Sequence, residues 1–204
     1  MKKLTLVLVL IALSVTSFAQ RGYKGYKSGK GGRNSYECPK LYVGVTAGIE
    51  NPGGLVGFNI DVPVTGKFSL SGNVGLSSWG SKAGAEGRFY FGDCNRSWAL
   101  GAGVTYNTGL KNFSATLPTT YGDATVLMNL NPRTNVFLAV HKFFNLGRSG
   151  HRFNIMAGYS LRLDDDNYTI LNNYELTSEG KNVMRVLAPG GLMIGFGFTF
   201  GVLR

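Results

Sequence analysis

Cysteine and histidine are scarce in this chain, with two of each among its 204 residues. So few sulfur and imidazole groups argue against a zinc site, which takes about four such ligands. The acidic run Asp164, Asp165 and Asp166 lacks the glycine and distal glutamate of a calcium-binding loop. We therefore assign no metal ligand, no cofactor-binding residue and no cofactor.

Catalytic groups are equally sparse. His141 and His151 have no serine and acidic residue at a readable spacing, whereas a nucleophile, base and orienting acid act together in hydrolases. His141 shares the alternation phase of Phe137 and Ala139, which favours a hydrogen-bonded interior histidine. No catalytic residue is assigned, and the chain is not expected to be an enzyme.

Long apolar runs are missing except for a short one at the N-terminus. Residues 4–13 are apolar and follow Lys2 and Lys3, and residues 17–19 have the small-x-small form of a cleavage site. We therefore predict a signal peptide over residues 1–19 and a mature chain that begins at Gln20. The run is shorter than the roughly 20 residues of a spanning helix. A mature chain that crosses a membrane must then cross it as strands.

Acidic residues are few, 11 against 21 Lys and Arg, and the net charge is +10. Much of the excess lies in residues 20–40, where Glu37 stands against six basic residues: Arg21, Lys24, Lys27, Lys30, Arg33 and Lys40. This Gly- and Tyr-rich segment has no apolar period, so we predict a disordered periplasmic arm. A solvated tether is expected, with contact to an anionic envelope polymer, lipid headgroups or a protein as the alternative. No nucleic-acid partner is expected for an exported protein.

Large apolar residues alternate with small or polar ones through most of residues 41–204. In residues 192–202 every even-numbered residue is large and apolar, whereas most odd-numbered residues are Gly or Thr. A period of two predicts strands, and the expected fold class is all-β. Nine segments show the pattern: 41–49, 56–62, 68–76, 83–91, 98–106, 126–130, 136–140, 153–163 and 192–202.

Charges are confined to one face of these strands. Asp61, Glu86, Arg88 and Arg162 all share a face with Gly, Ser and Asn, opposite the large apolar residues. A lipid-facing Lys or Arg costs roughly 2–4 kcal/mol at the bilayer midplane, so the separation predicts a transmembrane antiparallel up-and-down β-barrel over residues 41–204. The alternative, a soluble sandwich or lipocalin-like barrel, would bury the large face and expose long polar residues.

The number of strands is left between eight and ten, because such barrels usually have an even number. Either residues 168–176 form a weak tenth strand, or one of the nine segments belongs to an outer loop. Ten is preferred, since adding a weak strand is easier than discarding a clear one.

The strand region as a whole resembles the small porin-like outer-membrane β-barrels of Gram-negative bacteria, especially the Bacteroidetes type. The assembly signal of that family is similar to polar-x-Gly-x-x-aromatic-x-apolar, and Gly197, Phe200 and Val202 match its core. The chain departs from the family by ending in Leu203 and Arg204 rather than in an aromatic residue. The resemblance implies insertion into the cell outer membrane by the outer-membrane assembly machinery.

The interior of such a barrel is expected to be closed. Eight strands are just wide enough for their own side chains to fill, and ten leave little more room. We predict that Asp61, Glu86, Arg88 and Arg162 form a charge network that plugs the lumen. Glu86 and Arg88 are two apart on one strand and are expected to pair with neighbouring strands. A narrow pore and a specific ligand site are the alternatives.

The two cysteines flank strands on one side of the expected barrel. Cys38 precedes the first strand by three residues, and Cys94 lies in the turn after the fourth. If the N-terminus starts in the periplasm, both lie in that oxidising compartment. We predict a Cys38–Cys94 disulfide that draws the basic arm across the periplasmic mouth.

The function expected from these features is that of an outer-membrane β-barrel protein with short loops and a largely plugged lumen. It would act as a structural or interaction component of the envelope, or as an accessory subunit of a larger outer-membrane complex. A small-solute porin is the first alternative, and a lipid-modifying barrel enzyme is the second. The expected partners are outer-membrane lipid, the assembly machinery and another protein of the outer membrane.

Overall fold

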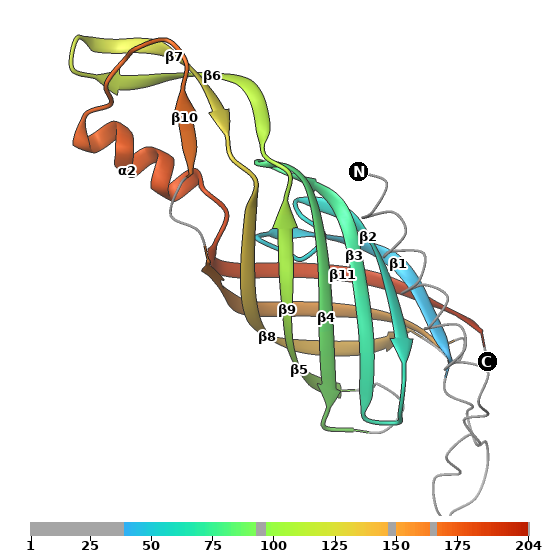
Figure 1. Cartoon of the computed structure of the whole chain (residues 1–204). Helices are drawn as coiled ribbons and strands as arrows, with labels where there is room; N and C mark the ends of the chain where they lie inside the picture. Colours follow the sequence, from blue (N-terminus) through green and yellow to red (C-terminus); the bar gives the residue numbers. More distant parts are fainter. Residues whose placement is uncertain (1–38, 93–96, 147–149, 164–166, 204) are drawn as a thin grey trace, which may run out of the picture.

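A computed structural model of the chain describes residues 39–92, 97–146, 150–163 and 167–203. Eight antiparallel strands close into a barrel in the order β1-β11-β9-β8-β5-β4-β3-β2 (Figure 1). These strands are β1 (Leu41–Ile49), β2 (Val56–Pro63), β3 (Phe68–Ser77), β4 (Gly80–Tyr90), β5 (Ser97–Asn107), β8 (Arg133–Leu146), β9 (His151–Arg162) and β11 (Gly191–Leu203). The predicted all-β, antiparallel up-and-down barrel is thus confirmed.

The strand number lies at the lower end of the predicted range, and the preference for ten is wrong. Residues 126–130 belong to β7 (Gly122–Leu130), which lies outside the barrel. The weak segment 168–176 contains the short strand β10 (Tyr168–Ile170), which pairs with β7 and not with the barrel. Alternation predicts a strand but does not say which sheet the strand joins, so an inserted hairpin was counted as barrel wall.

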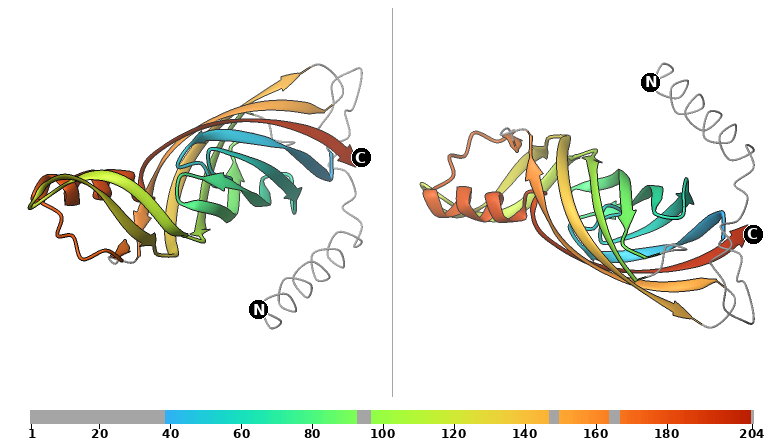
Figure 2. Two further views of the ribbon diagram at one scale, coloured as in Figure 1. Left: turned by 90° about the horizontal axis from the view of Figure 1, so that it is seen from above. Right: turned by 90° about the horizontal axis from the view of Figure 1, so that it is seen from below.

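Two long connections build a separate small layer, which also makes the expectation of short loops wrong. The β5–β8 connection contains β6 (Leu110–Thr119) and β7, and the β9–β11 connection contains β10 and α2 (Ser178–Leu187). Strands β10, β7 and β6 form a three-stranded sheet against which α2 packs. We call these four elements the projecting unit. They lie beyond one end of the barrel, which we call the unit end. The C-terminus lies at the opposite end, which we call the turn end (Figure 2).

The projecting unit has its own apolar core. Thr177 starts α2 as its N-cap, with a side-chain oxygen that accepts a 3.2 Å hydrogen bond from the Gly180 amide. The indole of Trp79 enters this core from the β3–β4 turn and donates a 2.9 Å hydrogen bond to the Asn131 carbonyl. The core residues are Trp79, Leu117, Val126, Met128, Leu130, Leu176, Met184 and Ala188. Because Trp79 belongs to the barrel, the unit is packed onto the barrel rim.

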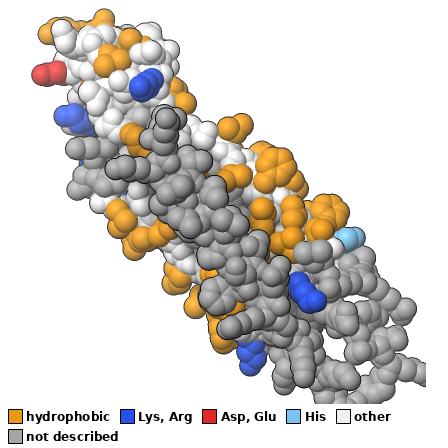
Figure 3. Space-filling model, turned by 45° about the vertical axis from the view of Figure 1, so that its right-hand side comes forward, with side chains coloured by type: hydrophobic (Ala, Val, Ile, Leu, Met, Phe, Trp, Pro, Cys, Tyr) orange, Lys and Arg blue, Asp and Glu red, His pale blue; other side chains and the backbone are white. Residues whose placement is uncertain are grey.

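The outward face of the barrel wall is apolar and exposed. Figure 3 shows hydrophobic side chains along the barrel, with the charged side chains it displays lying towards the two ends of the molecule. Among the described residues of the barrel strands, Lys142 is the only charged residue whose position in the alternation points outward. Large exposed members of this outer belt are Val45, Phe58, Ile60, Leu70, Val74, Leu100, Val104, Leu138, Val140, Ile155, Ile194 and Phe196.

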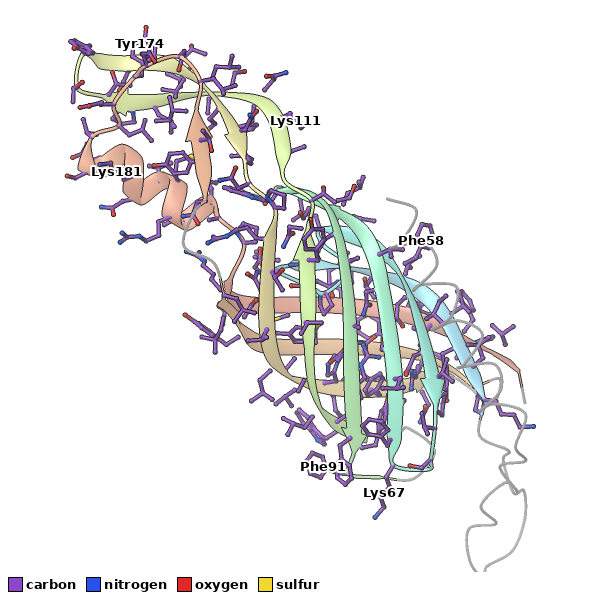
Figure 4. All side chains as sticks on the ribbon, viewed as in Figure 1. Phe58, Lys67, Phe91, Lys111, Tyr174 and Lys181 are labelled. Carbon is purple, nitrogen blue, oxygen red and sulfur yellow. The ribbon has the colours of Figure 1, made fainter. Side chains whose placement is uncertain are left out.

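Aromatic side chains gather on the outside near the turn end. Phe91 points outward there in Figure 4, and Phe89 packs edge-to-face against it with ring centroids 5.8 Å apart. The Lys142 ammonium lies 4.9 Å from the centroid of the Trp98 ring, within cation–π range. The outward charge therefore sits against an aromatic ring at the edge of the belt.

The barrel closes between the first and last strands. β1 pairs with β11 along its length, from Val43 opposite Phe200 to Ile49 opposite Ile194. One irregularity between Leu41 and Tyr42 shifts the register near the turn end. Of the helices formed by the described residues, none combines the length and apolar character needed to cross a bilayer.

Candidate functional site

The interior of the barrel is the candidate functional site, because many of its buried side chains are polar or charged. An unpaired charge in such a place is strongly unfavourable, so its partners decide what the site can do. Buried polar residues of the barrel strands include Asn59, Asp61, Ser69, Ser71, Asn73, Glu86, Arg88, His141, Arg152, Asn154 and Thr199.

Asp61 is the first centre of a charge network. Its Oδ2 atom forms an ion pair with the Arg152 guanidinium and accepts a 3.2 Å hydrogen bond from the Tyr90 hydroxyl. Arg88 Nη1 lies 3.4 Å from the same oxygen. These groups come from β2, β4 and β9, so the carboxylate joins separate parts of the wall through the lumen.

Glu86 is the second centre. Its Oε2 atom accepts hydrogen bonds from Arg88 Nε at 2.9 Å and Nη2 at 2.7 Å. Its Oε1 atom lies 2.6 Å from His141 Nε2 on β8. Arg88 thus bridges Glu86 and Asp61, and the two acidic centres form one network. The expected pairing with neighbouring strands is not what the structure shows. Glu86 and Arg88 pair with each other on β4 and reach across the lumen to β8 and β2, each of which is separated from β4 by one strand.

Gly101 makes room for the Glu86–His141 contact. It faces inward on β5, directly opposite Arg88 on β4. A Cβ atom at this position would collide with Glu86 Oε1 and lie 3.0 Å from His141 Nε2. The small residue that the alternation places on the inner face is therefore required for two large side chains to meet.

Arg152 also closes the lumen at the turn end. Its Nε donates a 3.0 Å hydrogen bond to the Thr199 hydroxyl. Its guanidinium carbon lies 3.6 Å from the Tyr42 ring centroid and 4.6 Å from that of Phe143. The cation is 1% exposed and held between two aromatic rings from strands separated by β11 and β9.

The unit end of the lumen is closed by backbone. The β1–β2 loop turns inward, and its residues Asn51, Pro52, Gly53 and Gly54 are all buried. Lys82 on β4 is also buried and forms a 3.0 Å ion pair with Glu50 at the start of this loop. Described residues therefore lie inside the lumen at both ends, with the charge network between them.

Arg162 lies apart from the network, which corrects its predicted role. It sits at the unit end of β9, where its Nε donates to the Pro189 carbonyl at 3.0 Å. Its Nη2 atom donates to the carbonyls of Arg185 and Ala188 at 2.9 Å each. A cation is favourable at a helix C-terminus, so Arg162 fastens α2 to the barrel. The alternation of the strand predicted correctly that Arg162 points inward, but it could not predict where along the barrel axis the side chain lies.

The sequence analysis missed three buried cations of the barrel strands: Arg152, Lys82 and Arg133. Each continues the inward phase of its strand by one step, from Asn154, Gly84 and Asn135 respectively. Extending the alternation one step further into each turn would have found all three. Glu50 carried no such signal, because it lies in a loop.

Several predicted features lie outside the described residues. These are the signal peptide, most of the basic arm, Cys38, Cys94 and the acidic run 164–166. Gly197, Phe200 and Val202 lie on β11, with Gly197 on the inner face and the other two on the outer face.

Each carboxylate of the charge network has at least two cationic or donor partners among the described residues. In the part of the chain that the structure describes, no three His, Cys, Asp or Glu residues are grouped as metal ligands. Comparisons with protein-family models, curated protein sequences and solved structures find no match, so the functional argument rests on this geometry.

Proposed function

We propose that this protein is an outer-membrane β-barrel with a plugged lumen that carries an interaction module on one end. The observation that carries the proposal is the outer belt, which is apolar and exposed around a wall whose charges, Lys142 excepted, point inward. In water such a belt would be an aggregation surface, whereas hydrocarbon is its natural solvent. Trp98 and Lys142 at the edge of the belt suit the boundary between hydrocarbon and headgroups.

A structural role is favoured over that of a small-solute porin, because conduction requires an open lumen. Arg152 fills the turn end, the inturned loop fills the unit end, and Glu86 and Arg88 bridge the space between. Opening such a lumen would require breaking buried ion pairs, which is strongly destabilising unless new partners replace them.

The projecting unit supports the role of interaction component or accessory subunit. Trp79 and Arg162 hold its two insertions on the rim, so the unit is presented in a fixed orientation rather than on a flexible tether. Lys111, Tyr174 and Lys181 lie on this unit in Figure 4, and Tyr121 at the β6–β7 turn is 86% exposed. A rigidly mounted module lowers the entropy lost on binding a protein partner.

The remaining features complete the proposal. The signal peptide directs export, the residues Gly197, Phe200 and Val202 engage the assembly machinery, and the basic arm extends into the periplasm. A Cys38–Cys94 disulfide would have to cross the mouth, because β1 and the β4–β5 turn are separated by β2 and β3 around the ring. Mass spectrometry under non-reducing conditions, with both thiols free, would exclude that bond.

Fractionation and gel migration test the proposed location. The full chain expressed with its own leader should be found in the outer membrane, and the folded protein should migrate faster before boiling than after. Equal migration of boiled and unboiled samples, together with recovery from the soluble fraction, would contradict the barrel in a membrane.

Planar-bilayer recording tests the plugged lumen separately. The purified protein should give no single-channel steps, and reproducible steps would favour the porin.

A pull-down in mild detergent should recover a partner with the full chain, and removal of α2 and β10 from the bait should abolish recovery if the projecting unit is the interaction module.

A further inference from the structure

Few of the described hydrogen bonds attach the inturned β1–β2 loop to the barrel. Its base is tied by backbone hydrogen bonds from Gly48 to Leu55 at 3.1 Å and from Leu55 to Leu76 at 2.7 Å. At its tip, the described hydrogen bonds to the wall all come from Lys82, which donates to the Glu50 carboxylate at 3.0 Å and the Glu50 carbonyl at 3.3 Å. The buried Lys82 ammonium therefore contributes to holding the tip in the mouth.

The fit of the tip depends on glycines of the wall. Gly57 and Gly75 lie so close to the Gly53 carbonyl that a Cβ atom at either position would collide with it. A Cβ at Gly84 would lie 2.9 Å from the Pro52 carbonyl. Glu50 itself has a φ of +54°, in the left-handed region that non-glycine residues rarely occupy. The tip is thus packed closely, but it is strained at the residue that makes the ion pair.

Polar atoms around the tip lack hydrogen-bond partners. They are Thr46 Oγ1, Asn51 Nδ2, Thr105 Oγ1 and Asn107 Nδ2, all on side chains that are more than nine-tenths buried. Asn107 is directly opposite Lys82, and Thr105 is directly opposite Gly84. Buried polar atoms without partners are uncommon, and each costs free energy comparable to a lost hydrogen bond. The seat of the tip therefore offers donors that the tip leaves unused.

From this geometry we propose that the mouth of the lumen is a binding site for a small carboxylate, which Glu50 occupies in the described conformation. Lys82 supplies the cation, and the neighbouring Asn107 amide and Thr105 hydroxyl supply hydrogen bonds that Glu50 does not use. Displacement of residues 50–54 exposes this seat and lets a solute carboxylate replace the internal one. Glu50 is 16% exposed at its side chain, so the exchange can begin from solvent.

Competition between the internal and external carboxylate sets the expected affinity. A group on a short tether acts at an effective concentration of millimolar order or more, so the intact protein should bind carboxylates weakly. In Glu50→Gln the carboxylate is gone but the side-chain shape is kept. Lys82 is then a buried cation without its ion-pair partner, which favours uptake of an anion from solution.

The test is an NMR titration of isotopically labelled, detergent-folded full chain with sodium acetate, against sodium chloride at equal ionic strength. Glu50→Gln should show saturable acetate-specific shifts at Gly53, Gly75 and Gly84, with an affinity at least about tenfold tighter than the wild type. Glu50→Gln with Lys82→Met is the matched control, because it keeps the neutral loop and removes the cation, and it should lose the shifts.

Equal acetate titrations for Glu50→Gln and the double variant would overturn the proposal, as would chloride shifts equal to those of acetate. If Glu50→Gln does not fold, hydrogen exchange of the wild type answers the same question. Acetate should then speed exchange of the Gly54 and Leu55 amides without changing that of β8 and β9, and unchanged exchange would contradict the displacement. Neither outcome depends on membrane location or on conductance, so the proposed function can stand or fall separately.

Discussion

Arg152 and Asp61 are 91 positions apart in the sequence and form an ion pair inside the barrel. β9 and β2 are separated by β11 and β1 around the ring, so the pair connects distant parts of the wall through the lumen rather than along it. The same guanidinium also lies between the rings of Tyr42 and Phe143 at the turn end. One side chain therefore connects β9 with β1, β2 and β8 inside the barrel.

Arg152→Met should destabilise the protein strongly, because Asp61 then keeps a buried negative charge with fewer cationic partners. Loss of one member of a buried ion pair typically costs about 3–5 kcal/mol. Urea unfolding in detergent or lipid, followed by tryptophan fluorescence, measures the loss. Adding Asp61→Asn in the same chain should recover part of it, and a double variant no more stable than Arg152→Met would contradict a direct coupling.

Gly101→Ala should destabilise the network without changing any charge. The added methyl group would displace the Glu86 carboxylate from His141, and overpacking of this kind costs about 1–3 kcal/mol. Gly72→Ala on β3 is the matched control, because a Cβ atom there meets nothing within 4 Å. Similar unfolding midpoints for the two variants would show that the close approach at Gly101 does not contribute to the free energy of unfolding.

Ala102→Arg tests whether the outer belt faces hydrocarbon. Ala102 is exposed on β5 midway between Trp98 and Tyr106, and a midplane Arg is expected to cost about 2–4 kcal/mol in a bilayer. The same substitution at the exposed Ser81, near the unit end, should cost no more than about 1 kcal/mol. Refolding into lipid vesicles measures both. Equal stability of the two variants would indicate that the belt is not in lipid.

Arg162→Ala should loosen the projecting unit and leave the barrel intact. The variant removes three hydrogen bonds to the C-terminal end of α2, so amide exchange in α2 and β10 should speed up while exchange in β8 and β9 stays unchanged. Arg185→Ala is the control, because the contact described for Arg185 uses its backbone carbonyl rather than its side chain. Uniformly faster exchange throughout the chain would instead indicate global destabilisation.

The interior charges show what alternation can predict and where it stops. Asp61, Glu86 and Arg88 lie within long alternating segments, so their inward orientation follows from the phase of their neighbours. Arg162 also points to the inner face, yet it contacts the end of α2 rather than the charge network. Alternation gives the face of a residue but not its position along the barrel axis. His141 was assigned to the interior correctly, but its partner Glu86 is 55 residues away and no local pattern links them.

The elements outside the barrel were harder to foresee for a different reason. β7 alternates as regularly as a barrel strand, because one face of it packs against α2 and the other does not. The inturned loop looked like an ordinary turn, since Pro52 and the following glycines are typical of exposed turns. Its burial is a tertiary property that depends on Gly57 on β2 and Gly75 on β3, which leave room for the Gly53 carbonyl.

Pairing of β1 with β11 has a consequence for how the molecule is made. Tyr42 and Gly201 are neighbours in the closed ring, although nearly the whole strand region separates them along the chain. The ring therefore cannot close until the final strand has been synthesised, and every earlier stage exposes an unpaired edge at β1. A chain cut short before Gly191 would keep that edge open, which makes the last strand the step that commits the barrel to completion.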